Sequence, residues 1–281
     1  MSAQILNGKD LSVSIREELK KEVDELVNKG ITPGLAVILV GDDPASKVYV
    51  NNKKKACEQT GIHSFQYFLD STTKETDLLD MIGQLNEDRA VHGILVQLPL
   101  PSHMDEQKII SAIDPKKDVD CFHPYNIGKL FTGSPTYLPC TPAGVMELIK
   151  LSGIAPAGKE CVVLGRSNIV GKPLAVMLLK ENGTVTICHS KTGNLKEVTK
   201  RADILVAAVG RAHFITEDMV KQGAVVIDVG INRMDNGKLT GDVDFENVKN
   251  VAAAITPVPN GVGPMTITML LKNTVEAARK Q

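Results

Sequence analysis

Apolar residues recur with two different spacings along this chain. Between residues 10 and 29 they keep the three-to-four spacing of an amphipathic helix, which Gly30 ends. Short continuous apolar runs then alternate with further helical stretches. They predict strands at 36–40, 64–69 and 93–96, and helices at 45–60, 73–86 and 105–113. This alternation predicts an α/β fold with a mostly parallel sheet and with ligands at the carboxyl ends of its strands.

Residues 114–142 interrupt the pattern. They contain five prolines, two glycines and little periodicity, so we expect a long loop that is either a domain boundary or a functional segment. A second β-α series follows it. The predicted helices are 143–151, one from the glycine-rich loop to about 182, and 266–280; the predicted strands are 160–164, 185–188, 204–208, 225–229 and one near 251–255, with a hairpin turn at 235–238.

Composition narrows the class of protein without identifying a function. The chain has 281 residues, a hydrophobic content of 43% and a net charge of −1, so a substantial core is expected and no general attraction to nucleic acid or anionic membranes. The five cysteines are dispersed, which favours reduced thiols in a cytoplasmic protein. We expect no signal peptide, because the first ten residues lack a basic segment and a long apolar run, and no stretch reaches membrane-spanning length.

A glycine-rich loop opens the second β-α series. Gly165, Ser167 and Gly171 follow a predicted strand and precede a predicted helix, the arrangement that binds phosphate through backbone amides and the helix N-terminus. The spacing is one residue longer than G-x-G-x-x-G, so a simple tight turn is the alternative. The position of the loop at the start of a new β-α-β series favours nucleotide binding.

The end of the next strand distinguishes NADP from NAD. NAD-binding units usually place an acidic residue there to hold the ribose 2′-hydroxyl, whereas this chain has His189, Ser190 and Lys191. Ser190 can donate a hydrogen bond to a 2′-phosphate, and Arg166 adds positive charge. The sequence therefore predicts NADP as the cofactor, with His189 more simply a surface residue at a strand end.

Tyr49 and Lys53 are a candidate proton-transfer pair. They lie four residues apart on the predicted helix that Asp42 or Asp43 caps and Pro44 begins, so they share a face. The same spacing occurs in short-chain dehydrogenases, but there the pair follows the glycine loop. The alternative is an ordinary amphipathic helix with a half-buried tyrosine and a solvated lysine cluster.

Other polar residues support the interpretation of Tyr49 and Lys53 as a proton-transfer pair. Gln97 ends the third strand, where its amide could bond Lys53 or simply cap the strand. Asp120 could accept a hydrogen bond from a heterocyclic ring, although it and Asp118 could also form Asx turns. Lysine has an ordinary pKa near 10.4, so Lys53 can act as a base near neutrality only if it is desolvated or close to other positive charge. No spacing of His or Cys indicates a metal site.

Several motifs occur in order along nearly the whole chain. They are Asp43-Pro44-Ala45-Ser46, Tyr49-Val50-x-x-Lys53-x-Lys55, Gly93-Ile94-Leu95-Val96-Gln97-Leu98-Pro99-Leu100-Pro101, Lys117-Asp118-Val119-Asp120, Pro139-Cys140-Thr141-Pro142, Gly165-Arg166-Ser167-x-Ile169-Val170-Gly171-Lys172-Pro173 and Pro257-Val258-Pro259-x-Gly261-Val262-Gly263-Pro264-Met265-Thr266. Together they resemble the motifs of the bifunctional methylenetetrahydrofolate dehydrogenase/cyclohydrolase family.

The resemblance implies two α/β domains with a cleft between them: residues 1–140 plus 264–281 for tetrahydrofolate and catalysis, and a Rossmann-type NADP domain at 141–263 with a parallel sheet. It implies a cytoplasmic homodimer of one-carbon metabolism and purine biosynthesis, with no nucleic-acid or membrane partner. Lys53 would be the acid/base of the cyclohydrolase step. The other implied catalytic residues are Tyr49, Gln97 and Asp120; folate would also contact Leu98, Pro259, Gly263 and Thr266; and NADP would contact Gly165, Arg166, Ser167, Ser190 and Ile231.

Two positions depart from the family pattern. Cys121 and Asn260 stand where the family usually has glycine. Asn tolerates a left-handed backbone better than most residues, so the loop around Asn260 is expected to keep its shape.

Three competing hypotheses remain at this point. A dehydrogenase with weak or absent cyclohydrolase would have the same fold, although the set of Tyr49, Lys53 and Gln97 argues against it. A non-catalytic NADP-binding module would not need those polar residues. A related two-domain enzyme such as shikimate dehydrogenase is disfavoured by the motif at 257–266.

Overall fold

The computed structural model describes residues 2–281 and divides the chain into two compact units. Unit 1 contains the chain up to Ser12 together with Thr141–Thr266, and unit 2 contains Val13–Cys140 and Ile267–Gln281. Both units are α/β, as predicted. The start of the chain lies in unit 1, whereas the sequence analysis placed it with residues 13–140.

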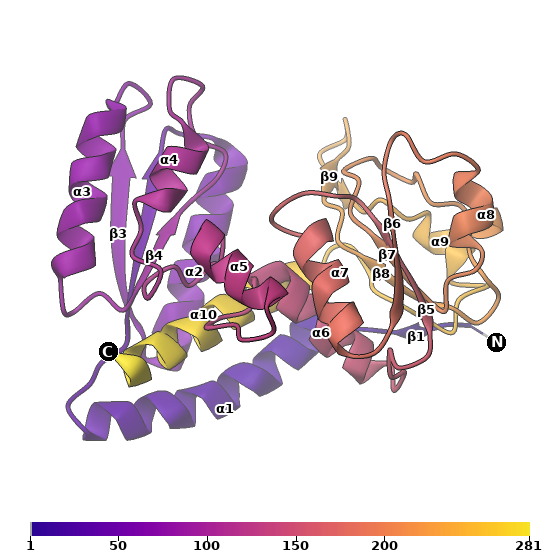
Figure 1. Cartoon of the computed structure of the whole chain (residues 1–281), viewed down its shortest axis with the longest axis horizontal. Helices are drawn as coiled ribbons and strands as arrows, with labels where there is room; N and C mark the ends of the chain where they lie inside the picture. The colour runs from indigo at the N-terminus through magenta and orange to yellow at the C-terminus, as the bar shows by residue number, and fades with distance from the viewer. Residues whose placement is uncertain (1) are drawn as a thin grey trace. The chain divides into compact units, whose positions relative to one another are not determined.

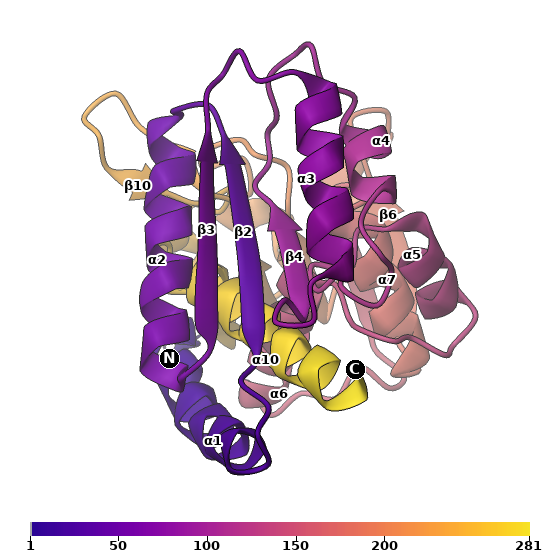
Figure 2. The same cartoon turned by 90° about the vertical axis from the view of Figure 1, so that its left-hand side faces the viewer.

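Unit 2 is built on a small parallel sheet with strand order β3-β2-β4 (Figure 2). Its strands and principal helices confirm the predicted alternation to within a few residues. They are β2 (Gly34–Val40), α2 (Pro44–Thr60), β3 (His63–Leu69), α3 (Glu75–Glu87), β4 (Gly93–Val96) and α4 (Glu106–Ser111). Every residue of β2 is buried, which explains its continuous apolar sequence.

The predicted long loop at 114–142 was wrong in part, because it contains helix α5 (Pro124–Phe131). Pro124 occupies the first turn, where proline is tolerated, and the side chain of His123 accepts a hydrogen bond from the amide of Tyr125. The following helix, α6 (Cys140–Leu151), also begins three residues earlier than predicted. Both helices have a proline in the first turn, whereas the sequence analysis took the prolines of this segment as a sign of a loop.

Unit 1 contains a six-stranded sheet with order β1-β11-β8-β7-β5-β6, in which all neighbours are parallel (Figure 1). The chain moves from β5 to β6 on one side and then to β7 on the other, so the order reverses at β5. The elements are β1 (Gln4–Ile5), β5 (Glu160–Leu164), α7 (Gly171–Lys180), β6 (Thr184–Cys188), α8 (Leu195–Thr199), β7 (Ile204–Ala207), η1 (Glu217–Met219), β8 (Val225–Asp228), α9 (Phe245–Val248) and β11 (Ala254–Ile255).

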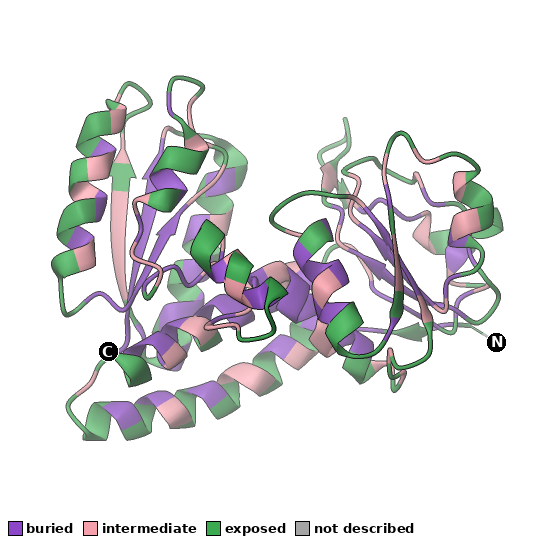
Figure 3. Ribbon diagram, viewed as in Figure 1, coloured by how far each residue is buried: buried purple, intermediate pink, exposed green. Residues whose placement is uncertain are grey.

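Short elements account for most of the differences from the predicted pattern in unit 1. Strand β1 has only two residues and forms by pairing with β11, so it is too short to be predicted from the spacing of apolar residues. The predicted hairpin is confirmed: β9 (Asn232–Arg233) and β10 (Leu239–Thr240) pair antiparallel. Strands β5, β7 and β8 are largely purple in Figure 3, because they lie in the buried core of the unit.

Two long helices continue across the unit boundary. Helix α1 (Gly8–Asn28) changes units between Ser12 and Val13, and α10 (Val262–Lys280) changes units between Thr266 and Ile267. Helix α10 begins four residues before the predicted start. Asn273 on α10 donates hydrogen bonds to the carbonyls of Val119 (2.8 Å) and Leu138 (2.9 Å), so polar contacts help to hold the part of this helix after Thr266 in unit 2.

A buried carboxylate in unit 1 should make stability depend on pH. Burial raises the pKa of Asp228 to about 7 from its ordinary value of 3.8, although three backbone amides donate to it. Because the folded state then binds the proton more tightly, Asp228 favours folding at low pH. That contribution declines as pH rises toward 7, by up to about 1.4 kcal/mol per pH unit.

We therefore expect the unfolding free energy of the natural protein, relative to Asp228→Asn, to fall between pH ~4 and 7 and to level off above pH 7. Denaturant unfolding at a series of pH values measures this difference. A constant difference across that range would contradict the assignment.

Candidate functional site

Helix α2 carries the first part of the candidate site in unit 2. Asp43 is the cap: its carboxylate accepts from the amide of Ser46 at 2.7 Å, and Pro44 occupies the first turn. Gly61 ends the helix with φ 80°. Tyr49 and Lys53 lie one turn apart on it, and Lys53 is buried, with 8% of its surface exposed.

The Lys53 amine donates a hydrogen bond of 2.8 Å to Oε1 of Gln97, which confirms the predicted amide contact. Gln97 directly follows β4, and its own amide nitrogen donates to the carbonyl of Leu98 at 2.7 Å. This second bond orients the amide so that its oxygen faces the lysine. Burial lowers the pKa of Lys53, so the structure meets the condition that the sequence analysis set for a lysine base.

Asp120 completes this group of charged residues. Its negative charge favours the charged form of Lys53 and opposes the effect of burial, while burial raises the pKa of the Asp120 carboxyl. Two groups of opposite charge, each shifted toward its neutral form by desolvation, can exchange a proton at small cost in free energy. Tyr49 is partly buried, which raises the pKa of its phenol, and among the described residues its hydroxyl has no hydrogen-bond partner.

Cys140 is a member of this group that the sequence analysis did not select. It is buried, and its thiol hydrogen-bonds to Asp120. The thiol also approaches the carbonyl of Val119 at 3.3 Å. Burial raises the pKa of the thiol well above its ordinary value, so Cys140 is present as the thiol and not as a nucleophilic thiolate. Its place in the Pro139–Pro142 motif was the available signal.

Neighbouring acidic and basic residues have structural roles. Asp118 is buried and accepts from the amides of Phe122 (3.1 Å) and His123 (2.9 Å), which lie four and five residues on and therefore do not form the Asx turn of the alternative prediction. Lys117 donates to two carbonyls at the end of α3. The two departures from the family glycines, Cys121 (φ 61°) and Asn260 (φ 79°), both adopt left-handed backbone, which confirms the expectation for Asn260.

The glycine loop of unit 1 has no room for side chains at its two ends. Gly165 has φ 124°, and a Cβ there would lie 2.3 Å from the carbonyl oxygen of Ala208; a Cβ at Gly171 would lie 2.1 Å from the oxygen of Gly165. The hydroxyl of Ser167 accepts from the amides of Val170 and Gly171 at the start of α7. These contacts bring backbone amides close together at a helix N-terminus, the arrangement that favours phosphate.

All the predicted cofactor residues lie at the carboxyl edge of the six-stranded sheet. Gly165, Arg166 and Ser167 follow β5, Ser190 follows β6, and Ile231 follows β8. Arg166 and Ser190 are exposed, and 44% of Ile231 is exposed. The site fits a dinucleotide with a 2′-phosphate: the glycines admit the pyrophosphate, and no acidic side chain stands at the end of β6.

The predicted folate residues of unit 1 surround the start of α10. Thr266 lies within hydrogen-bond distance of Thr141, with 3.0 Å between their hydroxyl oxygens. The loop that contains Pro259 leads into α10, which carries Gly263, and it packs on the beginning of α1, where a Cβ at Gly8 would lie 1.9 Å from the carbonyl oxygen of Gly261. Within residues 2–281, no cluster of side chains could hold a metal ion, and no helix is long and apolar enough to cross a membrane.

Comparisons with known proteins place these features in a family. The model of the tetrahydrofolate dehydrogenase/cyclohydrolase catalytic domain matches residues 6–120, and that of the NAD(P)-binding domain matches residues 139–281. The bifunctional protein FolD of Acetivibrio thermocellus is 65% identical over 281 residues, which is 100% of this chain and 99% of that protein.

Solved structures agree with the sequence comparisons. The bifunctional enzyme FolD of Campylobacter jejuni is 52% identical with a TM-score of 0.97, covering 99% of each chain. The Trypanosoma brucei enzyme, complexed with NADP cofactor and inhibitor, is 40% identical with a TM-score of 0.96, covering 100% of this chain and 98% of that one. Shikimate dehydrogenase of Thermus thermophilus, at 16% identity and a TM-score of 0.54 over 88% of this chain and 98% of that one, shares the fold alone.

Proposed function

The chain belongs to the tetrahydrofolate dehydrogenase/cyclohydrolase family, and from this membership we propose that it oxidises 5,10-methylenetetrahydrofolate with NADP and hydrolyses the methenyl product to 10-formyltetrahydrofolate. The observation that carries the hydrolytic half is the 2.8 Å bond between the buried Lys53 and Gln97. The alternative of a dehydrogenase with weak or absent cyclohydrolase is not favoured, because relatives of up to 65% identity over the full length are named bifunctional.

Lys53 would carry the proton transfers of the hydrolytic step. Water adds to the electrophilic methenyl carbon, and the proton that the water loses goes to the neutral Lys53 amine. The same group then returns a proton to the folate nitrogen as its bond to that carbon breaks. The hydroxyl on that carbon loses its proton to solvent and becomes the carbonyl of the formyl group, which stays on the other nitrogen. Gln97 orients the amine through its amide oxygen, and we propose that Tyr49 and Asp120 support this step.

The dehydrogenase step depends mainly on orientation. The substrate nitrogens stabilise the cation that remains when the methylene carbon loses hydride, and NADP supplies the hydride acceptor when bound. This chain contributes the glycine loop, which places the cofactor phosphates at the N-terminus of α7. Asp120 and Leu98 stay proposed folate contacts, as do Pro259, Gly263 and Thr266, and Ile231 stays a proposed cofactor contact.

A coupled assay tests the two activities together. The protein is mixed with 5,10-methylenetetrahydrofolate and NADP, and the absorbances of NADPH and of the methenyl product are followed at the same time. NADPH formation without methenyl accumulation is expected for the bifunctional enzyme. Methenyl accumulation would support a dehydrogenase only, and the absence of NADPH would contradict the proposed function.

The preference for NADP is expected to depend on Arg166 and Ser190. A double variant that combines Arg166→Ala with Ser190→Asp removes a positive charge and places a carboxylate where the 2′-phosphate would bind, so kcat/KM for NADP relative to NAD should fall about 10²-fold. Steady-state kinetics with both cofactors measures the ratio. Lys191→Ala, which removes a neighbouring positive charge, is a control for general electrostatic effects, and an unchanged ratio in the double variant would refute the assignment.

We also propose that the protein is a cytoplasmic homodimer that supplies one-carbon units for purine biosynthesis. A free sheet edge supports self-association: β3 lies at the edge of its sheet, and Phe68 on it is 62% exposed. Sedimentation of the purified protein measures its oligomeric state, and a monomer at all concentrations would contradict the dimer.

A further inference from the structure

Two buried aspartates in unit 1 lie outside the residues assigned so far. Asp228 ends β8, and Asp242 lies in the segment after β10; their exposed fractions are 3% and 0%. Neither forms an ion pair with a described residue, and both accept hydrogen bonds chiefly from backbone amides. A carboxylate that accepts hydrogen bonds from several backbone amides holds the loops that carry those amides in place.

Asp242 holds two segments at the carboxyl edge of the sheet. One carboxylate oxygen accepts from the amides of Val209 (2.6 Å) and Gly210 (3.0 Å), which follow β7. The other oxygen accepts from the amide of Arg211 (2.8 Å) and the side-chain amide of Asn232 (2.9 Å), which follows β8. Each oxygen therefore takes two donors, and the carboxylate joins the loop after β7 to the loop after β8.

Asp228 connects Asp242 to the same loops. It accepts from the amides of Gly230 (2.9 Å), Asp242 (3.0 Å) and Val243 (2.9 Å). Glycine makes room for the two carboxylates: a Cβ at Gly230 would lie 2.2 Å from Oδ1 of Asp242, and one at Gly241 would lie 1.8 Å from Oδ2 of Asp228. Ile231 stands between Gly230 and Asn232, so both of its neighbours are tied to this pair.

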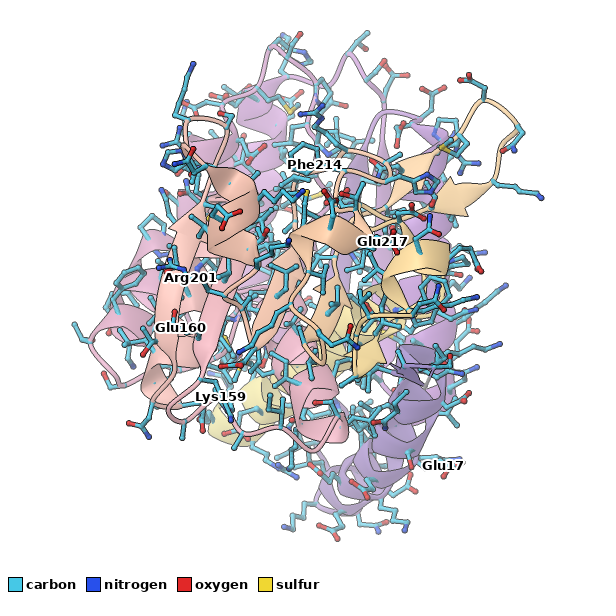
Figure 4. The ribbon with its side chains drawn as sticks, turned by 90° about the vertical axis from the view of Figure 1, so that its right-hand side faces the viewer. Glu17, Lys159, Glu160, Arg201, Phe214 and Glu217 are labelled. Carbon is cyan, nitrogen blue, oxygen red and sulfur yellow. The ribbon has the colours of Figure 1, made fainter. Side chains whose placement is uncertain are left out.

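The segment after β7 also borders the glycine loop. The Ala208 carbonyl is the group that a side chain at Gly165 would meet. At its other end Phe214, labelled in Figure 4, packs against the core, and the Arg211 guanidinium lies 4.6 Å from its ring centre. In a sheet of this kind the dinucleotide binds where the strand order reverses, with its adenosine ribose at the strand that follows the glycine loop. The loops after β7 and β8 then border the nicotinamide half.

We infer that Asp242 is a positioning residue for the nicotinamide half of NADP, acting through the segments Val209–Arg211 and Gly230–Asn232 that its carboxylate joins. The inference rests on the proposed dehydrogenase function. It assigns Asp242 no contact with the cofactor and no part in the hydrolytic step, whose candidate residues lie in unit 2.

Asp242→Asn is the informative substitution. It keeps the size of the side chain, but it replaces an oxygen that accepts two hydrogen bonds with a group that donates, so one loop must move. We expect kcat/KM for NADP to fall about 10²-fold, because a displacement of about 1 Å at a reacting group has this effect. Cyclohydrolase activity on the methenyl substrate should stay within about twofold of the natural protein.

Two further measurements separate positioning from a general structural defect. The compound 2′,5′-ADP represents the adenosine half of NADP alone, and its dissociation constant by calorimetry should change less than about twofold in Asp242→Asn. Asp244→Asn is the matched control: the same change two residues away, where the carboxylate accepts a hydrogen bond from the side chain of Asn247. Its NADP kinetics should equal those of the natural protein.

These measurements distinguish failure of the inference from failure of the proposed function. Loss of NADP turnover in Asp242→Asn with 2′,5′-ADP binding and hydrolysis retained supports the inference. Equal loss of 2′,5′-ADP binding, or NADP kinetics like those of Asp244→Asn, overturns it and leaves the proposed function standing. If the natural protein itself forms no NADPH, the proposed function fails and the inference fails with it.

Discussion

Replacing Lys53 with methionine should lower cyclohydrolase activity about 10²- to 10⁴-fold and leave part of the dehydrogenase activity. Methionine fills the buried space of the lysine stem but cannot accept or donate the proton that water addition requires. The hydride step needs no such group, because the substrate nitrogens stabilise the cation. The loss of the donor to Gln97 should cost about 1 kcal/mol in unfolding free energy, too little to unfold the protein.

Lys54→Met is the matched control for this variant. It makes the same chemical change at the next residue, where half of the side chain is exposed and the amine lies 4.0 Å from Glu58. Both activities should be unchanged there. Hydrolysis of purified methenyl substrate measures the first activity and NADPH formation the second. Full hydrolysis by Lys53→Met would rule out Lys53 as the acid/base.

The pH profile gives an independent check on Lys53. Burial lowers its pKa, so the fraction of neutral amine rises at a lower pH than for an exposed lysine. Cyclohydrolase activity of the natural protein should therefore increase with pH through that lowered pKa, and the residual activity of Lys53→Met should lack this rise. Asp120 opposes the effect, so Asp120→Asn should move the rise to still lower pH.

Gly165→Ala should impair the dehydrogenase and leave the cyclohydrolase active, which is the reverse of the effect expected for Lys53→Met. A methyl group at this position would lie 2.3 Å from the Ala208 oxygen, in a backbone conformation that only glycine adopts readily. We expect a loss of about 2–4 kcal/mol in unfolding free energy and about 10²-fold in dehydrogenase kcat/KM, as the loop amides shift. Cyclohydrolase activity should persist at temperatures where the variant stays folded, because Lys53, Gln97 and Asp120 belong to unit 2.

Gly83→Ala is the control for this second variant. Gly83 lies on an exposed face of α3, with open space where a Cβ would be, and alanine should stabilise the helix by up to about 1 kcal/mol. Thermal unfolding and the two activity assays compare the variants. Normal NADP kinetics in Gly165→Ala would show that the loop does not need glycine for cofactor binding.

The sequence predicted the regular part of the fold because buried strands and amphipathic helices leave local periods. It did not predict β1, since two residues form a strand there only by pairing with β11 some 250 positions away. It placed Pro124 in a loop, although proline in the first turn of α5 costs no hydrogen bond. The first error concerns a contact between distant parts of the chain, and the second concerns the exact position of one residue in a helix. The spacing of apolar residues along the chain reports neither.

The candidate site was predictable where residue type and strand ends coincide. The Lys53–Gln97 bond followed from a polar residue at the end of an apolar strand, and the glycine loop followed from its position at the start of a new β-α-β series. Cys140, Asn273 and Asp242 were not selected, because their roles depend on which carbonyls, carboxylates and amides surround them. Those neighbours lie up to 154 positions away, and only the folded chain brings them together.

The path of the chain through α1 and α10 has a consequence for synthesis on the ribosome. Residues 13–140 of unit 2 are translated before residues 141–266 of unit 1. At that stage unit 2 still lacks the part of α10 that follows Thr266, including buried Leu271 and the Asn273 that bonds Val119. Its core is therefore incomplete until residues 267–281 leave the exit tunnel. Unit 2 waits for the second part of α10 with an apolar surface still uncovered, where chaperones can bind.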